Sequence, residues 1–137
     1  MTRLVVGASG TLGIVTEATL KLTSVAANLQ VAVVPFPSTH KAVHAASQMI
    51  QRGIQIEAME LMDEVSMRAA NESGYTDVEY SEAPTLFLKF AGTSAPAVAK
   101  QVADVEALMK GNKCTEFRAS KDPDTIEGLW GARKTTL

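Results

Sequence analysis

The sequence of 137 residues is 46% hydrophobic and 20% charged, a balance typical of one globular domain with its own core. Its thirteen basic and fifteen acidic residues leave a net charge of −2, which does not favour binding to nucleic acid or to an anionic membrane surface. The single cysteine excludes an internal disulfide, and no apolar run is long enough for a signal peptide or for a membrane span of ~18 residues.

A glycine-rich segment precedes the first predicted element. Polar and apolar residues alternate over residues 12–22, a period of two that predicts a half-buried strand. Gly7, Gly10 and Gly13 lie at or before its start, in a spacing that matches neither the dinucleotide-binding G-x-G-x-x-G pattern nor a phosphate loop. The spacing alone favours a tight turn with positive φ, but it does not exclude a loop whose bare backbone approaches a cofactor.

From residue 29 onward the chain alternates strand and helix patterns. Strands are predicted at residues 29–34, 54–61, 86–90 and 114–120, and helices at 38–52, 63–70, 94–111 and from 122 to the C-terminus. This β-α-β, short helix, β-α-β order predicts the α+β class. More narrowly, it predicts a ferredoxin-like arrangement with a four-stranded antiparallel sheet and helices on one face.

Two histidines and an acidic cluster are candidate sites for metal or acid–base chemistry. His40 and His44 lie four residues apart on a predicted helix, a spacing that can bind a metal. No carboxylate lies beside them at helical spacing, so a solvated helix face is favoured. The prediction is therefore that this chain holds no metal site.

The acidic cluster surrounds the segment IEAMELMDE and consists of Glu57, Glu60, Asp63 and Glu64. Paired carboxylates can transfer protons. Asp63 is more simply a helix cap, with Glu64 favourable in the first turn. Glu60 falls on the same face as Ile54 and Ile56 if the strand is regular, which predicts a partner for it.

The last predicted helix places an arginine on an apolar face. The residues on this face, at i, i+4, i+7 and i+11, are Ile126, Trp130, Arg133 and Leu137. A guanidinium cannot lose its charge, so Arg133 needs an anion or solvent. The pattern alone favours an ion pair or a side chain that reaches water over a ligand-binding role.

The string GASGTLGIVTEATLKL, residues 7–22, resembles the closing segment of the FAD-binding domain in flavoproteins of the vanillyl-alcohol-oxidase type. It is closest to the branch that contains D-lactate dehydrogenases, glycolate oxidase flavin subunits and D-2-hydroxyglutarate dehydrogenases. The later strings VVPFPSTHKAV, IEAMELMDEVSM and LWGARKTTL resemble, in the same order, the substrate (cap) domain of that family. Ala8 stands where Ser is common, and Ser9 stands where Glu is usual.

The resemblance implies a division of the chain at residue 25. Residues 1–25 would be the C-terminal end of an FAD-binding domain, contributing its terminal loop and strand, and residues 26–137 part of the FAD-linked oxidase C-terminal domain. The implied FAD contacts are Ala8, Ser9, Gly10, Thr11, Gly13, Ile14 and Val15. By this resemblance, Ser9 in place of Glu would remove one side-chain contact near the flavin, and the backbone contacts of Ser9, Gly10, Thr11 and Gly13 would remain. Arg133, in the W-x-x-R pattern, would bind the substrate carboxylate, a role that suits its planar pair of donors.

The implied function is hydride transfer from the α-carbon of a D-2-hydroxy acid to FAD, with cytochrome c or a quinone as the electron acceptor. The metal-binding and catalytic residues of the family lie C-terminal to the W-x-x-R helix, so none is assigned to this chain. Both ends of the sequence are typical of cuts through a larger protein. We therefore expect the isolated chain neither to retain FAD nor to turn over substrate.

The resemblance implies a mitochondrial location in a eukaryote, a cytoplasmic or inner-membrane-peripheral location otherwise, and no secretion. The alternative is a non-enzymatic ferredoxin-like module that binds a ligand or a partner. That alternative predicts that the first 25 residues pack on the sheet and that Arg133 forms an internal salt bridge.

Overall fold

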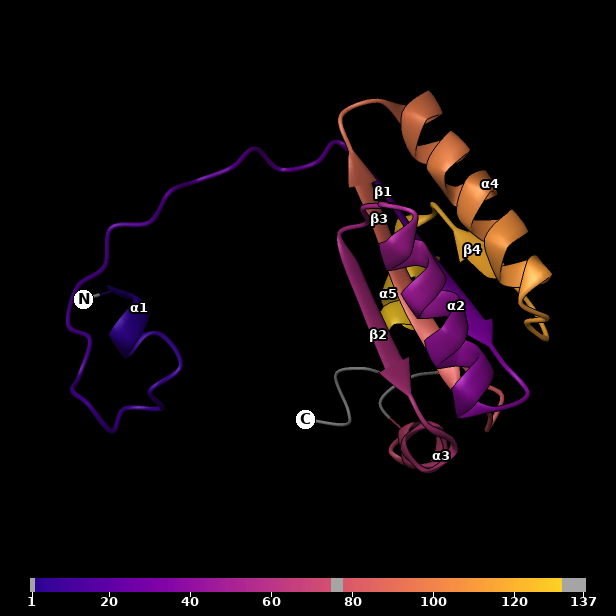
Figure 1. The fold of residues 1–137 in the computed structure, drawn as a ribbon, viewed down its shortest axis with the longest axis horizontal. Helices are drawn as coiled ribbons and strands as arrows, with labels where there is room; N and C mark the ends of the chain where they lie inside the picture. Colours follow the sequence, from indigo (N-terminus) through magenta and orange to yellow (C-terminus); the bar gives the residue numbers. More distant parts are fainter. Residues whose placement is uncertain (1, 75–77, 132–137) are drawn as a thin grey trace.

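The computed structural model of the chain describes residues 2–74 and 78–131 (Figure 1). In chain order the elements are α1 (Thr2–Val5), β1 (Asn28–Pro35), α2 (Thr39–Gln51), β2 (Ala58–Met62), α3 (Glu64–Glu72), β3 (Thr85–Gly92), α4 (Ala95–Gly111), β4 (Arg118–Ser120) and α5 (Pro123–Gly131).

The four strands form one sheet in the order β2-β3-β1-β4, and every neighbouring pair is antiparallel. β1 and β3 form the centre and pair along their full lengths, from Asn28 opposite Gly92 to Pro35 opposite Thr85. β2 adds to the free edge of β3, and β4 adds to the free edge of β1. Two βαβ units in this order give the predicted ferredoxin-like arrangement, so the fold class is confirmed.

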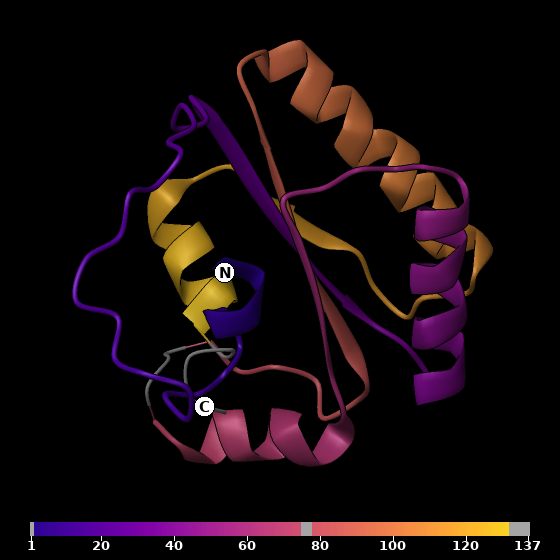
Figure 2. The ribbon, with the colours of Figure 1, turned by 60° about the vertical axis from the view of Figure 1, so that its left-hand side comes forward.

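One face of the sheet is covered by α2 and α4 (Figure 2). Both helices turn an apolar stripe toward the sheet at the spacing of one helix face. The strands contribute alternate residues to this first core, namely Ala32, Val34, Leu86, Leu88 and Phe90. The helices contribute Met49, Val98, Val102, Val105 and Met109.

The opposite face is also covered, by α3 and α5, so the prediction of helices on one face only is wrong (Figure 2). Val31 and Val33 of β1 and Phe87 of β3 point into this second core, where they meet Met67 and Leu129. Burial of both faces explains why residues 31–36 form one unbroken buried run. The usual alternation of buried and exposed residues is lost when helices cover both sides of a strand.

The predicted helix boundaries hold within two residues wherever the structure describes them, because local signals set them. The predicted continuation of the last helix to the C-terminus lies outside the described residues. Gly53 adopts φ +68°, the left-handed conformation that ends α2 at low cost. Three side chains cap the first free N–H groups of their helices: Ser38 bonds Lys41 N, Asp63 bonds Ser66 N, and Asp122 bonds Thr125 N. Ser94 occupies the capping position of α4 without such a side-chain bond.

The edge strands are shorter than predicted. β2 begins at Ala58 rather than at residue 54, and β4 begins at Arg118 rather than at residue 114. Ile54 and Ile56 pack against the first core as irregular chain, whereas Glu60 pairs with Phe87 and lies on the second face. The prediction that Glu60 shares a face with these isoleucines is therefore wrong. Apolar packing of Ile54 and Ile56 and single backbone bonds, such as that from Glu57 N–H to the Lys89 carbonyl at 2.9 Å, hold this segment without regular strand pairing.

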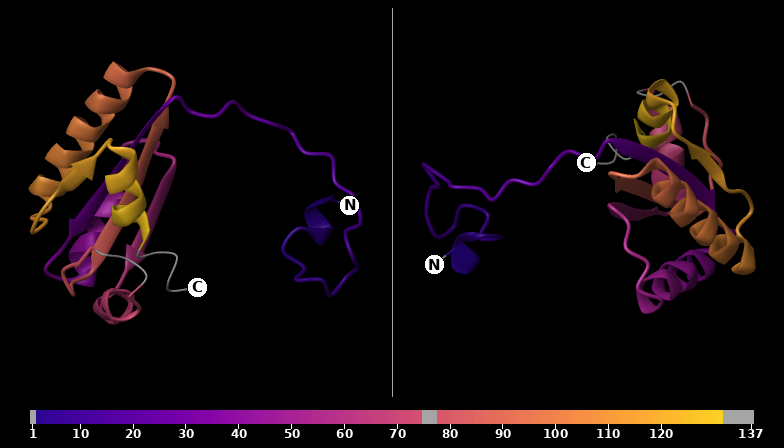
Figure 3. Two further views of the ribbon diagram at one scale, coloured as in Figure 1. Left: turned by 180° about the vertical axis from the view of Figure 1, so that it is seen from behind. Right: turned by 90° about the horizontal axis from the view of Figure 1, so that it is seen from above.

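The predicted strand at residues 12–22 is absent. Residues 13–26 have no regular structure, and residues 9–25 are exposed (Figures 1 and 3). In the views from behind and from above, this segment runs away from the sheet. A strand forms only where a neighbouring strand accepts its backbone hydrogen bonds. No other strand of the described chain lies beside this segment, so its alternating pattern alone does not produce one.

Candidate functional site

The glycine segment forms a tight, exposed turn. Gly7 and Gly10 adopt φ of +85° and +78°, and Ser9 between them adopts +49°. A methyl group added at either glycine would meet no atom within 4 Å. The glycines are therefore required by the backbone conformation and not by crowding. This geometry agrees with the turn that the spacing predicted.

Two of the predicted FAD-contacting residues use their amides inside the turn. Ala8 N–H donates to the Val5 carbonyl at 3.1 Å, and Thr11 N–H donates to the Ala8 carbonyl at 2.9 Å. The Thr11 hydroxyl donates to the same carbonyl at 2.6 Å. In the described part of the chain, the amides of Ser9 and Gly10 have no such acceptor. Successive amides around a left-handed residue form a concavity that suits an electron-rich ligand atom.

Apolar side chains follow this turn and are solvent-exposed. Ile14, Leu22 and Val25 are 91%, 87% and 94% exposed, and Leu12 and Leu20 are also largely exposed. Burial of a side chain of this size stabilises a protein by roughly 1.5–3 kcal/mol. A run of such residues left in water is typical of a surface that another structural unit covers.

The second face of the sheet positions the helix that precedes Arg133. Leu129 of α5 is buried, and Trp130 meets Phe87 of β3 edge-on with 6.3 Å between ring centroids. Ile126 packs beside them. The predicted apolar face of this helix is therefore confirmed through residue 130. Arg133 itself lies outside the described residues, two positions after the end of α5.

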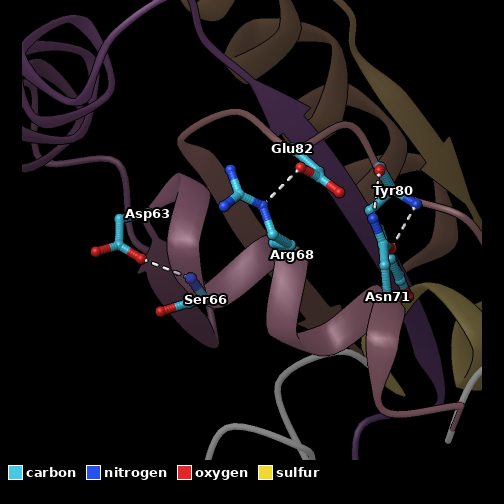
Figure 4. Close-up of polar contacts among 6 residues, drawn as sticks. All are labelled: Asp63, Ser66, Arg68, Asn71, Tyr80 and Glu82. Carbon is cyan, nitrogen blue, oxygen red and sulfur yellow. Dashed lines mark hydrogen bonds and ion pairs between the residues drawn. The ribbon is translucent and has the colours of Figure 1, made fainter.

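A polar cluster that no sequence pattern indicated lies beside this helix, and Figure 4 shows part of it. Asn71 of α3 bonds the backbone of Tyr80 twice: its Oδ1 accepts from Tyr80 N at 3.0 Å, and its Nδ2 donates to Tyr80 O at 2.9 Å. The Tyr80 hydroxyl donates to the carbonyl of Gly128 in α5 at 2.5 Å. Tyr80 lies in a polar stretch without periodicity, so no pattern could have identified these bonds.

Within the acidic cluster, Asp63 is engaged as a helix cap. The backbone N–H and then the hydroxyl of Ser66 lower the pKa of Asp63 below its ordinary value of 3.8, as expected for a helix cap (Figure 4). Glu57 and Glu64 are exposed, and Glu60 is half-buried beside Phe87. Asp63 therefore has the structural role that the sequence favoured.

The histidine pair lies over a shallow hollow between α2 and the end of α4. The rings of His40 and His44 stack with 6.5 Å between centroids, and His44 Nδ1 lies 2.9 Å from Asn112 Oδ1. The hollow has a volume of about 290 Å³, and lysines rather than carboxylates complete its lining. In residues 2–74 and 78–131, no three His, Cys, Asp or Glu side chains gather as metal ligands. None of the helices in those same ranges is long and apolar enough to cross a bilayer.

Two curated proteins are similar in sequence to nearly the whole of this chain. The mitochondrial D-lactate dehydrogenase (cytochrome) of Kluyveromyces lactis is 42% identical over 135 residues, which are 98% of this chain and 23% of that protein. The mitochondrial D-lactate dehydrogenase (cytochrome) 1 of Saccharomyces cerevisiae is 44% identical with the same coverage. The chain thus spans about a quarter of the length of these relatives.

Solved structures and family membership agree with this result. An alkyldihydroxyacetonephosphate synthase structure superposes with a TM-score of 0.65 at 19% identity, over 93% of this chain and 28% of that one, which supports the fold. Residues 25–137 match the family described as FAD linked oxidases, C-terminal domain. The resemblance seen in the sequence is confirmed, and the chain belongs to the FAD-linked oxidase family.

Proposed function

We propose that the chain is part of an FAD-dependent dehydrogenase that oxidises a D-2-hydroxy acid such as D-lactate. The observation that carries the proposal is 42–44% identity, over 98% of the chain, to two proteins named D-lactate dehydrogenase (cytochrome). Membership in the FAD-linked oxidase family supplies the cofactor class. When bound, FAD would provide the hydride acceptor for this chemistry.

Residues 7–15 fit a role at the flavin through their backbone. The predicted contact residues are Ala8, Ser9, Gly10, Thr11, Gly13, Ile14 and Val15. Ala8 and Thr11 shape the turn with their own amides, which leaves Ser9 and Gly10 to donate outward. The missing side chains at Gly10 and Gly13 leave space for a flat ligand against the backbone.

The proposed domain boundary is also supported by exposure. Residues 9–25 are exposed, whereas β1 enters the core three residues after its start. Residues 1–25 would pack as the end of an FAD-binding domain, and residues 26–137 would form part of the cap domain. The alternative of a self-sufficient binding module predicts that the first 25 residues pack on the sheet. Their exposure favours the dehydrogenase fragment.

Arg133 is the proposed anchor for the substrate carboxylate. A guanidinium can bind both carboxylate oxygens at once, which fixes the direction of the α-carbon as well as its position. The helix before it is held against the second core by Leu129 and Trp130. The catalytic base and any metal ligand are proposed to lie in another part of the complete protein.

The proposed electron acceptor is cytochrome c or a quinone, and the proposed location is the mitochondrion in a eukaryote. Two relatives carry both "cytochrome" and "mitochondrial" in their names, which supports these assignments. Reduction of cytochrome c by the purified complete protein, compared with reduction of a soluble quinone, would distinguish the acceptors.

The complete reading frame, expressed and purified with FAD, tests the proposal directly. D-lactate added without oxygen is expected to bleach the flavin absorbance, and L-lactate is expected to leave it unchanged. Arg133→Lys is expected to raise KM for D-lactate by about a hundredfold or more, as the loss of a bidentate charged contact does. Equal bleaching by both enantiomers, or a near-normal KM in Arg133→Lys, would refute the corresponding part of the proposal.

A further inference from the structure

Tyr80 links three elements on the second face of the sheet. Its side chain is 6% exposed, and its ring lies 6.0 Å from the ring of Phe87 in β3. Asn71 of α3 holds its backbone from both sides. Its hydroxyl reaches across to the Gly128 carbonyl of α5. The contacts with Asn71 and Phe87 therefore hold Tyr80 in place independently of α5.

The contact with α5 occurs where the helix lies close to the segment that precedes Tyr80. A methyl group at Gly128 would lie 3.1 Å from a methyl group of Val78, so the glycine allows the helix to lie against this segment. Leu129 and Trp130 supply apolar contacts in the next two positions. Apolar contacts are not directional and permit a helix to slide or rotate slightly. A hydrogen bond to one carbonyl of the helix adds the direction that they lack.

We propose that Tyr80 is a positioning residue for substrate binding, because its hydroxyl fixes the rotation and axial position of α5. The proposal rests on the proposed role of Arg133, which follows Gly131 by two residues. Since the chain is continuous, the orientation of α5 sets where the segment carrying Arg133 begins. A shift of about 1 Å at a substrate-orienting group can reduce the rate by about a hundredfold.

The test uses the complete FAD-loaded protein with Tyr80→Phe, which removes the hydroxyl and keeps the ring. We expect KM for D-lactate to rise by about tenfold, a loss comparable to one neutral hydrogen bond transmitted to the binding site. The dissociation constant for oxalate, followed through the flavin spectrum, should rise by a similar factor. Oxalate is a suitable probe because it presents a carboxylate and has no α-hydrogen to lose. The value of kcat should change less than KM.

A matched control separates positioning from general destabilisation. Val102→Ala creates a cavity in the first core, on the other side of the sheet from α5. It should lower Tm at least as much as Tyr80→Phe while leaving KM and oxalate binding unchanged. An equal rise of KM in both variants would show a stability effect and overturn the proposal.

The double variant tests whether Tyr80 acts through Arg133. In an Arg133→Ala background, Tyr80→Phe should raise KM by less than twofold, because the group that it positions is gone. A full tenfold effect in that background would overturn the positioning role. If Arg133→Ala has a raised KM but Tyr80→Phe does not, only the positioning role fails. A normal KM in Arg133→Ala would instead refute the proposed function of Arg133.

Discussion

Asn71 and Tyr80 are joined by a reciprocal pair of hydrogen bonds, in which one side-chain amide satisfies both the N–H and the carbonyl of one backbone position. The pair joins α3 to the segment that enters β3 (Figure 4). It replaces the pairing that a strand neighbour would provide. A side chain thereby fixes an irregular part of the chain.

Asn71→Ala is expected to destabilise the fold by about 1–3 kcal/mol, because it removes two hydrogen bonds to a partly buried backbone position. The midpoint of urea unfolding measures this loss. Arg68→Ala is the matched control, since Arg68 lies on the same helix and its ion pair with Glu82 is exposed. That variant should lose less than about 1 kcal/mol. Equal losses in the two variants would contradict the role given to Asn71.

Local patterns were sufficient for the centre of the fold. β1 and α4 could be predicted because each carries a complete signal: an apolar run closed by Pro35 in β1, and an apolar stripe that ends at Gly111 in α4. Chain order and the rules for βαβ units then fixed the sheet order. The predicted strand at residues 12–22 is absent for a non-local reason. Its period of two was correct for a strand, but pairing is a non-local requirement that no local pattern contains.

In the candidate site too, local patterns predict some features, whereas others depend on residues far apart in the chain. The turn at Gly7 and Gly10 could be predicted from residue type, because positive φ is a property of the local backbone. The contact from Tyr80 to Gly128 joins residues 48 positions apart, and neither residue type is diagnostic. The role of α5 in covering the second face was missed for a related reason. The apolar residues of β1 point to both faces, and only the assembled sheet shows that the second face needs a cover.

Gly53 and Gly111 predict opposite effects of the same substitution. Neither position has an atom within 4 Å of an added methyl group, so packing does not decide the outcome. Gly53→Ala should destabilise the fold by about 1–2 kcal/mol because φ is +68° there. Gly111→Ala, in the last turn of α4, should stabilise it by about 0.5–1 kcal/mol. Chemical denaturation of both variants measures the difference, and a shift of the same sign in both would contradict this account.

Asp63 should make the stability depend on pH in the acid range. Bonds from Ser66 lower its pKa below 3.8 in the folded chain, so the unfolded chain binds a proton first as the pH falls. The contribution of Asp63 is therefore complete above about pH 4 and is lost as the pH falls through the lower folded pKa. Asp63→Asn keeps a capping oxygen without the charge. Its stability relative to the original chain should improve progressively below pH 4 in urea titrations, and a constant difference would contradict the linkage.

Cys114 should react slowly with alkylating reagents in the folded chain. It packs against the first core, and burial raises the pKa of its thiol above the ordinary value of 9.0. The thiolate is the reactive form, so iodoacetamide at pH 8 should modify the folded chain more slowly than the urea-unfolded chain. Equal alkylation rates in the folded and unfolded states would show that the thiol is not protected.

The raised pKa of Cys114 also determines how the stability changes with pH. The unfolded chain loses its proton first, so the contribution of Cys114 is present below the ordinary pKa of 9.0 and is lost as the pH rises through the folded pKa. Cys114→Ala should therefore gain stability relative to the original chain between pH 8 and pH 10, as measured by urea unfolding.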